Sequence, residues 1–545
     1  MDIWLTIKRQ KPYVSPVQMK PSSRTPAGPS RRAVSAPRTA APVILLSLRP
    51  ADVVPLYAQV YEGIREAIMA GRIGVGARVP SSRTLAAELG VSRTTITVAF
   101  DQLRSEGYIR GSRGGGSRVE AAMPELATRP TRAPTAQRTL RGTPPPRTPL
   151  VSVSTRGSHL VQAGARLVAN AGTSPRPFRI GVPTTDVFPT AVWAKLTSRR
   201  WRAGTVHLGD GDPAGDIELR EAIATYLTNA RGARCSSDQV IVVSGTQQAL
   251  DLAARVLLDP GDHVWMEDPG YGGAQSTFTA CDATIVPVPV DDEGMRIADG
   301  VQLHDGARMA YVTPSHQFPL GSVMSASRRL ALLSWSHRVG AWIIEDDYDS
   351  EFRYTGRPLP CLQGLEAQQY PDEANRRVLY VGTFNKVIAS GLRCGYLVVP
   401  DALIEPMRAA RAATDRHPPT PLQGVLTDFI REGHFARHIR RLRALYAQRQ
   451  VALLSAADTV LRDHLSFNAD AAGLHLVGRF LRASNDTAVA ARALEHGVEV
   501  QALSSFFANP TRAREQQGLV LSYAGFDEFA LCDAVDRLAR SMSRR

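Results

Sequence analysis

VLYVGTFNK, residues 378–386, is a run of apolar residues that passes through Gly-Thr and ends in a lysine. Its β-branched and aromatic composition, closed by a glycine, predicts a buried strand over residues 378–383. Lys386 then lies just past the strand end. A lysine that is partly removed from water there has a lowered pKa, and its neutral amine can bond to an aldehyde. Alone this is a weak signal, because most lysines are solvated surface residues.

Four other short apolar runs of the same kind lie in this half of the chain. They are VIVVSG (240–245), HVWMED (263–268), MAYVTP (309–314) and AWIIEDD (341–347). Helical patterns such as QQALDLAARVLL separate them. This alternation predicts an α/β fold, a mostly parallel sheet with helices on both faces. In such sheets the functional residues gather at the carboxyl ends of the strands.

Three more motifs stand at predicted strand ends. EDDYDSEF (345–352) places acids where one of them can keep a pyridine nitrogen protonated. VSGTQQAL (243–250) places Ser-Gly-Thr before a helix, where free backbone N–H groups favour a phosphate. EDPGY (267–271) offers Tyr271 for stacking on a flat ring. Each motif alone is equally compatible with a turn, a cap or the core, but together they fit one phosphorylated pyridine aldehyde.

A different module precedes this domain. PLYAQVYEGIREAIMAG (55–71) has apolar residues at helical spacing and ends at a glycine. In the following segment Ser81 or Ser82 can cap a helix over residues 83–89, Gly90 makes a turn, and Ser92 caps a second helix. Two short helices joined through a glycine-containing turn are typical of a helix-turn-helix.

The start of the second helix carries side chains suited to reading DNA. Arg93, Thr94, Thr95 and Thr97 offer hydrogen-bond donors and methyl groups of the kind that contact base edges in the major groove. The following GYIRGSRGGGSRVE (107–120) predicts a short hairpin whose glycines allow close approach to phosphates. A helix-turn-helix used only for packing remains the less favoured alternative.

Composition bounds the remaining possibilities. The 545 residues carry a formal net charge of +14, which favours a polyanionic partner, although Arg-rich soluble enzymes share this balance. The five cysteines are scattered without metal-ligand spacing, so we expect no metal site and a reducing, cytoplasmic location. No run approaches the roughly 18 apolar residues of a membrane span, and no signal peptide is evident.

Local composition also predicts the domain limits. Residues 1–44 are rich in Pro, Ser, Lys and Arg, and we expect a disordered basic tail. Residues 45–120 form the helix-turn-helix module. Residues 121–149 have the Pro/Arg-rich composition of a linker. Residues 150–545 form the large α/β domain.

On these motifs the chain resembles the MocR/GabR subfamily of GntR-family transcriptional regulators. In that subfamily a winged helix-turn-helix is fused to a fold-type I aminotransferase-like domain with a smaller C-terminal subdomain, and the latter binds pyridoxal 5′-phosphate (PLP). The resemblance covers most of the chain. Its matching segments are VPSSRTLAAELGVSRTTI, DPAGDIELREAIATYL, EDPGYGGA, TPSHQFPLG, IIEDDYDSEFRY, GTFNK and IREGHFARHIRRLR.

The resemblance implies specific roles. Lys386 forms the Schiff base with PLP, Asp346 pairs with the pyridine nitrogen, and Tyr348 bonds the ring hydroxyl. Tyr271 stacks on the ring. The implied phosphate ligands are Gly245, Thr246, Thr383, Asn385 and Arg393. Arg83, Arg93 and Thr95 face DNA, with Gly115 at the wing tip. The family also implies a head-to-tail homodimer.

Four positions depart from the pattern. Asn385 replaces a serine among the phosphate ligands but can still donate a hydrogen bond. Phe318 replaces the asparagine that bonds the ring hydroxyl. Asp210 replaces a tyrosine and would repel the phosphate unless it points away. Gly525 replaces the arginine that clamps a substrate carboxylate, which glycine cannot do. Cofactor binding is therefore expected to persist while substrate positioning is degraded.

The leading hypothesis is a DNA-binding regulator that senses PLP, an amino compound or both, without physiological turnover. The alternatives are a working PLP-dependent aminotransferase with a DNA-binding appendage, and a regulator whose large domain is only a dimerisation scaffold. The helix-turn-helix argues against the first alternative, and Lys386 with Asp346 argues against the second. The effector, the operator and the sign of regulation do not follow from the sequence.

Overall fold

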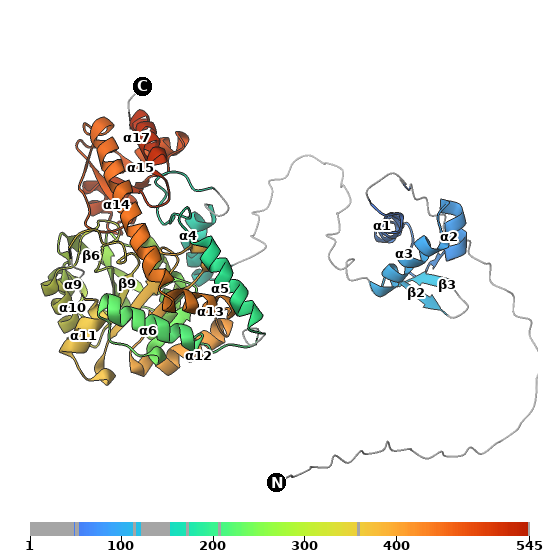
Figure 1. Ribbon diagram of the computed structural model, residues 1–545, viewed down its shortest axis with the longest axis horizontal. Coiled ribbons are helices and arrows are strands. Elements are labelled where there is room, and N and C mark those ends of the chain that lie inside the picture. Colours follow the sequence, from blue (N-terminus) through green and yellow to red (C-terminus); the bar gives the residue numbers. More distant parts are fainter. Residues whose placement is uncertain are drawn as a thin grey trace, which may run out of the picture. The chain divides into compact units, whose positions relative to one another are not determined.

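The computed structural model describes residue 48 and residues 54–112, 116–120, 153–169, 174–204, 209–356 and 360–542. The chain divides into two compact units, Met1–Pro146 and Arg147–Arg545 (Figure 1). The predicted tail (1–44), the predicted linker (121–149) and Gly115 lie outside the described residues. The domain limits therefore stay predictions.

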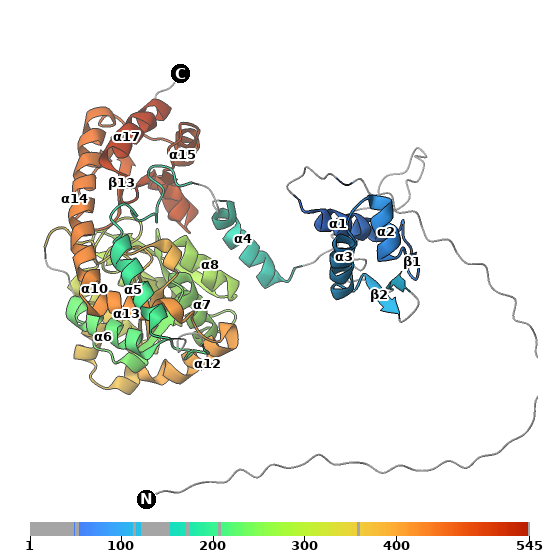
Figure 2. The same cartoon turned by 45° about the vertical axis from the view of Figure 1, so that its right-hand side comes forward.

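The first unit combines three helices with a small antiparallel sheet of order β1-β3-β2 (Figure 2). Its elements are α1 (Leu56–Met69), β1 (Arg78–Val79), α2 (Ser82–Leu89), α3 (Arg93–Ser105), β2 (Ile109–Ser112) and β3 (Gly116–Val119). One apolar core joins the helices to the inner face of the sheet, with Val60, Leu85 and Ile96 fully buried. This arrangement is a winged helix-turn-helix.

Capping residues set the helix limits as predicted. The Ser81 hydroxyl accepts a 3.1 Å hydrogen bond from the amide of Thr84 at the start of α2, which decides between the two candidate serines. Gly90 ends α2 at φ 65°, a left-handed conformation that glycine adopts without steric cost. The Ser92 hydroxyl accepts a 3.1 Å hydrogen bond from the amide of Thr95 and starts α3.

The second unit is built on an eight-stranded sheet of order β4-β11-β10-β9-β8-β5-β6-β7, in which β11 and β7 run against the other strands. The strands are β4 (Val240–Val243), β5 (His263–Asp268), β6 (Thr284–Asp291), β7 (Gly294–Met295), β8 (Met309–Val312), β9 (Trp342–Asp347), β10 (Val378–Thr383) and β11 (Gly395–Val398). All five strands predicted from the sequence are present. The mostly parallel sheet is confirmed.

Helices cover both faces of this sheet, and alternate residues of each strand enter opposite cores. Ile344 and Val381 pack with one set of helices, while Ile343 and Val378 pack on the opposite face. The first set is α7 (Thr246–Leu257), α8 (Gly272–Ala280) and α12 (Ile404–Asp415). The opposite set is α5 (Thr190–Arg202), α6 (Ile217–Arg231), α9 (Ile297–His304), α10 (Ala326–Val339), α11 (Leu362–Gln369) and α13 (Pro421–Arg431).

A smaller four-stranded antiparallel sheet, of order β12-β13-β15-β14, forms the C-terminal part. Its strands are β12 (Leu465–Phe467), β13 (His475–Phe480), β14 (Gln501–Ala502) and β15 (Gly518–Ser522). The long α14 (His434–Val460) runs from α13 to α17 (Glu528–Met542), as Figure 1 shows. The remaining helices are α4 (Thr155–Ala169), α15 (Asp486–Glu495) and α16 (Pro510–Glu515). In the part of the chain that the structure describes, no helix has the length and apolarity of a membrane span.

Candidate cofactor site and DNA-binding surface

Lys386 follows β10 and is held by one backbone carbonyl. Its Nζ donates a 2.9 Å hydrogen bond to the carbonyl oxygen of Gly181. A Cβ atom at Gly181 would lie 2.6 Å from this Nζ, and the left-handed backbone of Gly181, at φ 85°, also favours glycine. Burial lowers the pKa of the lysine to about 8, although the carboxylates of Asp349 and Asp346 oppose this shift. The amine therefore becomes neutral at a much lower pH than that of an ordinary lysine.

Asp346 lies on β9, directly beside Val381 of β10 in the parallel register. Tyr311 of β8 donates a 2.7 Å hydrogen bond to its Oδ2. Its Oδ1 is buried and has no hydrogen-bond partner among the described residues. Burial raises the pKa of this carboxyl to about 7, despite the hydrogen bond from Tyr311. A buried oxygen without a partner is costly, and a protonated ring nitrogen is a suitable partner for it.

The predicted phosphate-binding segment lies between β4 and α7. Helix α7 starts at Thr246 without a side-chain capping bond. The amide of Gln248 bonds the carbonyl of Gly245 at 3.1 Å, which leaves the amides of Thr246 and Gln247 for an anion. Gly245 precedes it at φ 141°. A Cβ atom there would lie 2.6 Å from Asn385 Nδ2 and 3.7 Å from the guanidinium of Arg393. The glycine thus allows the amide and the guanidinium to approach the helix start.

Asn385 connects the segments that carry the predicted phosphate ligands. Its Nδ2 donates a 3.3 Å hydrogen bond to the carbonyl of Ser244, and its Oδ1 accepts one of 3.1 Å from the amide of Cys394. Its own amide donates to the Thr383 hydroxyl at 3.1 Å. One Nδ2 hydrogen stays available. The guanidinium of Arg393 forms no ion pair with a carboxylate within the described ranges. These donors fit a phosphate.

Phe318 occupies the centre of an aromatic cluster. Its ring makes edge contacts with Tyr271 and Tyr348, at centroid distances of 5.9 and 5.8 Å. It also contacts His475 of β13 at 5.4 Å and Phe506 at 5.3 Å. The predicted ring-stacking and ring-hydroxyl residues are thus brought together around it. A phenyl ring therefore stands where aminotransferases have the amide of an asparagine.

The sequence did not indicate several residues of this site. Tyr311 and His316 lie within quoted motifs, yet nothing in those motifs marked their side chains. Gly181, His475 and Phe506 come from distant segments, and the hydrogen bond between Gly181 and Lys386 spans 205 positions. A local pattern cannot reveal such contacts.

Two of the four departures have a clear structural outcome. The side chain of Asp210 is 84% exposed, with its carboxylate 3.8 Å from Arg416 and 3.7 Å from His417. In the single chain this carboxylate is open to solvent. Gly525 follows β15, and a Cβ atom there would lie 2.9 Å from the carbonyl oxygen of Val182. Any larger residue must displace that backbone.

Arg512 and Arg437, the two arginines considered as substitutes for the missing clamp, both have partners in the structure. Arg512 donates a 2.9 Å hydrogen bond to the buried carboxylate of Asp268. Arg437 bonds His434 Nδ1 at 2.7 Å, within α14. Both guanidinium groups are therefore already engaged.

The first turn of α3 forms the predicted DNA-reading surface. Arg93 and Thr94 are exposed there, and Arg83 is exposed on α2. Thr95 is half-buried, and its hydroxyl lies 2.8 Å from the hydroxyl of Ser92. Three of these four side chains are thus free to meet a ligand, while Thr95 also stabilises the helix start.

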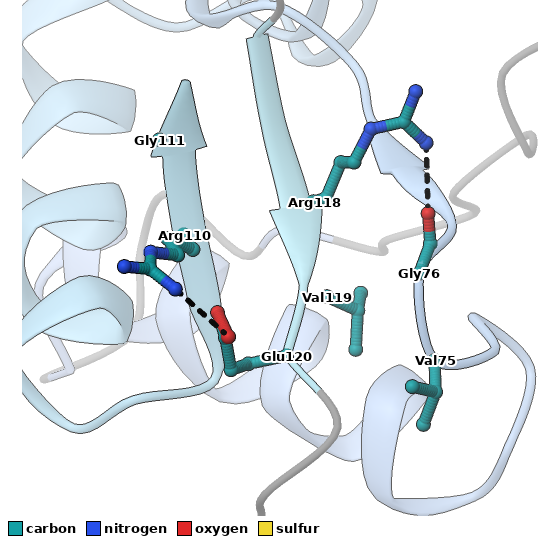
Figure 3. A pocket seen from close by; sticks show the side chains of 7 residues that line it. All are labelled: Val75, Gly76, Arg110, Gly111, Arg118, Val119 and Glu120. Atoms are coloured by element: carbon teal, nitrogen blue, oxygen red, sulfur yellow. Dashed lines mark hydrogen bonds and ion pairs between the residues drawn. The ribbon is translucent and has the colours of Figure 1, made fainter.

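The wing carries arginines that the sequence analysis did not single out. Arg118 of β3 lies directly opposite both Arg78 of β1 and Arg110 of β2, on the face away from the core. Arg118 donates a 2.9 Å hydrogen bond to the carbonyl of Gly76, and Arg110 lies 3.6 Å from Glu120 (Figure 3). A hollow of about 360 Å³ is lined in part by Gly76, Arg110, Arg118 and Glu120. Adjacent like charges repel, so an anion beside this row is favoured.

Comparison with known proteins agrees with both halves of this description. Residues 178–537 match the aminotransferase class I and II family, and residues 56–119 match the gntR family of bacterial regulatory proteins. The chain is 40% identical over 496 residues to the probable rhizopine catabolism regulatory protein MocR of Rhizobium meliloti, covering 90% of this chain and 94% of that one. The chain belongs to the MocR subfamily of GntR-family transcriptional regulators. The assignment to this subfamily from the sequence is confirmed.

Other relatives of this MocR-type chain include both regulators and enzymes. It is 30% identical to the pyridoxine biosynthesis transcriptional regulator PdxR of Corynebacterium glutamicum, over 89% of this chain and 96% of that one. The crystal structure of the α-aminoadipate aminotransferase LysN from Thermus thermophilus, with N-(5′-phosphopyridoxyl)-L-leucine, is 28% identical with a TM-score of 0.61. It covers 67% of this chain and 91% of LysN. The aminotransferase class I and II fold implies dependence on PLP.

Proposed function

We propose that this MocR-type regulator binds PLP at Lys386 and uses the occupancy of that site to control DNA binding by α3 and the wing. The observation that carries the proposal is the arrangement on two adjacent strands. Lys386 follows β10, and the unpartnered carboxylate oxygen of Asp346 lies on β9. This pair is suited to hold a pyridine aldehyde by its two ends.

The residues present fit the cofactor at each of its polar groups. Lys386 would bond to the aldehyde carbon and Asp346 would pair with the ring nitrogen. Tyr348 would bond the ring hydroxyl while Tyr271 covers the ring. The phosphate would meet the free start of α7 with Gly245, Thr246, Thr383, Asn385 and Arg393. When bound, PLP supplies an electrophilic carbon that amines can attack and an electron-withdrawing ring.

The surroundings favour sensing over turnover. Aminotransferases orient the substrate carboxylate with an arginine, and orientation accounts for much of their rate. Here Gly525 lacks a side chain, and Arg512 is engaged with the buried Asp268. The favoured effector is PLP itself or an amine without a carboxylate at that position. The PdxR relative, named for pyridoxine biosynthesis, is consistent with a cofactor-sensing role.

On the DNA side, Arg93, Thr94, Thr95 and Arg83 would read the operator, and Gly115 would approach it from the wing tip. The arginine row of Arg78, Arg118 and Arg110 would contact phosphates. Like its fold relatives, the large unit would form a homodimer, head-to-tail. A dimer would present two such modules to a two-part operator.

The direct experiment measures operator affinity of the full chain with and without PLP. Candidate operators come from selection of bound fragments from the host genome. We expect the dissociation constant to change with PLP in the wild-type chain and not in Lys386→Ala. If PLP changes the operator affinity of neither the wild type nor Lys386→Ala, the large domain serves only as a dimerisation scaffold. Steady transamination of an amino acid would favour the enzyme instead.

A further inference from the structure

His316 is a buried histidine beside the predicted ring-hydroxyl residue Tyr348. Its side chain is 1% exposed. Its Nδ1 lies 2.9 Å from the Tyr348 hydroxyl oxygen and 2.8 Å from Asp349 Oδ2. Its Nε2 lies 3.5 Å from Asp470 Oδ2. Both ring nitrogens therefore face oxygen atoms, and each faces a carboxylate.

This geometry favours the doubly protonated, charged imidazolium. Burial disfavours the charge, but Asp349 and then Asp470 more than offset it and raise the pKa of His316 to about 10. The other histidine in contact, His475, has its ring centroid 5.5 Å away. Burial lowers the pKa of His475 to about 3, so it stays neutral and adds no competing charge. A charged His316 can donate from both nitrogens and can accept from neither.

The backbone around His316 is shaped to this ring. Gly473 lies against the imidazole at φ 99°, and a Cβ atom there would overlap the ring. The carbonyl of Gly473 also accepts a 2.7 Å hydrogen bond from Tyr523, which fixes the segment. The position of His316 is thus determined from both sides, by the Asp349 carboxylate and by the Gly473 backbone.

We propose that His316 is a positioning residue: it donates a hydrogen bond to the Tyr348 oxygen, so that the tyrosine directs its own proton toward the ring oxygen of bound PLP. The inference rests on the proposed function, because it concerns the orientation of Tyr348 toward that cofactor. His316 would supply part of the control that an asparagine exerts in aminotransferases and that Phe318 cannot exert.

The consequence follows from donor and acceptor roles. An imidazole without a proton on Nδ1 would accept the Tyr348 proton and withdraw it from the site. An imidazolium cannot accept it, so the tyrosine proton goes to the ring oxygen of PLP or to the carboxylate of Asp349, which also contacts the Tyr348 hydroxyl. A donated hydrogen bond stabilises the anionic form of that oxygen. Loss of the imidazolium should therefore raise the pH at which the visible absorbance of the loaded protein changes.

The first test requires no cofactor. The ring nitrogens of ¹⁵N-histidine-labelled wild-type protein report protonation, and His316→Gln assigns the resonance. We expect His316 to carry protons on both nitrogens at pH 8, where an ordinary histidine is neutral. A His316 ring without a proton on Nδ1 at that pH would overturn the proposal, whatever the state of PLP binding.

The second test compares PLP-loaded variants by absorbance titration. His316→Gln should raise the pH midpoint by about one unit, equivalent to one pKa unit. Adding Phe318→Asn to this variant should lower the midpoint again. His337→Gln is the matched control, since His337 pairs with Glu366 elsewhere in the fold at 2.9 Å. An unchanged midpoint in a loaded His316→Gln protein would overturn the inference alone. Failure of the wild type to take up PLP would instead refute the proposed function.

Discussion

Tyr311 donates a hydrogen bond of 2.7 Å to one oxygen of Asp346, while the other carboxylate oxygen is buried without a partner among the described residues. The tyrosine fixes the orientation of the carboxylate, and the second oxygen remains for a ligand. This relationship locates the ring-nitrogen end of the candidate site.

Replacement of that carboxylate tests its assigned partner. Asp346→Asn keeps the shape but removes the charge that a protonated ring nitrogen needs. A charged hydrogen bond contributes about 1.5–3 kcal/mol, so PLP affinity should fall about 10- to 150-fold by equilibrium dialysis. Asp251→Asn, in a surface pair with Arg255, is the control and should bind normally. Equal affinity of both variants would remove Asp346 from the site.

The lowered pKa of Lys386 predicts how PLP loading depends on pH. Only the neutral amine attacks an aldehyde, and burial lowers its pKa to about 8. The loading rate should rise as the pH increases through 8 and level off above it. Stopped-flow absorbance between pH 6.5 and 9.5 measures this. A rate that still climbs steeply above pH 9 would indicate an ordinary, solvated lysine.

Alanine substitutions at two arginines of the first unit should affect DNA binding in different ways. Arg93→Ala should weaken operator binding by about 1–3 kcal/mol if Arg93 reads a guanine, with less effect on random DNA. Arg118→Ala should weaken binding to the operator and to random DNA alike. It should also reduce, by about 1, the slope of the logarithm of affinity against the logarithm of salt concentration. Arg104, paired with Asp101 at 2.6 Å, supplies a control by Arg104→Ala. Identical profiles for Arg93→Ala and Arg118→Ala would contradict these roles.

The missing carboxylate clamp predicts effector selectivity. Loss of a paired, buried charge contact typically costs 2–5 kcal/mol, or about 30-fold to several thousandfold in affinity. Alanine and 4-aminobutyrate should therefore bind the PLP-loaded protein weakly, with negligible transamination. Calorimetric titration of the wild type is the measurement, and micromolar binding would contradict the account. Gly525→Arg is a poor rescue, because its Cβ would press on the Val182 carbonyl beside Gly181.

Much of the fold follows from local pattern. The five apolar runs became β4, β5, β8, β9 and β10, because a parallel sheet buried on both faces needs uninterrupted apolar strands. Strands β6 and β11 were not singled out. In β6, Pro287 and Pro289 interrupt the apolar pattern. The capping serines were identified because a cap is a local interaction.

The site could be predicted only where one strand end supplies the residue. The motifs that contain Lys386 and Asp346 were singled out because each lies at a predicted strand end, and the family resemblance then pointed to these two residues. Gly181 and Phe506 were not, because long chain segments separate them from the residues they contact. The charge of Asp210 suggested repulsion of the phosphate, but its side chain is exposed and lies near Arg416 and His417.

Reduction of PLP-treated protein with borohydride, followed by peptide mass spectrometry, tests the central claim most directly. The chain has five lysines, of which Lys195 is exposed on α5 and supplies the matched variant Lys195→Ala. The account predicts one pyridoxyl adduct, on Lys386, present in the wild type and Lys195→Ala and absent from Lys386→Ala. An unmodified wild-type chain, or an adduct that persists in Lys386→Ala, would contradict it.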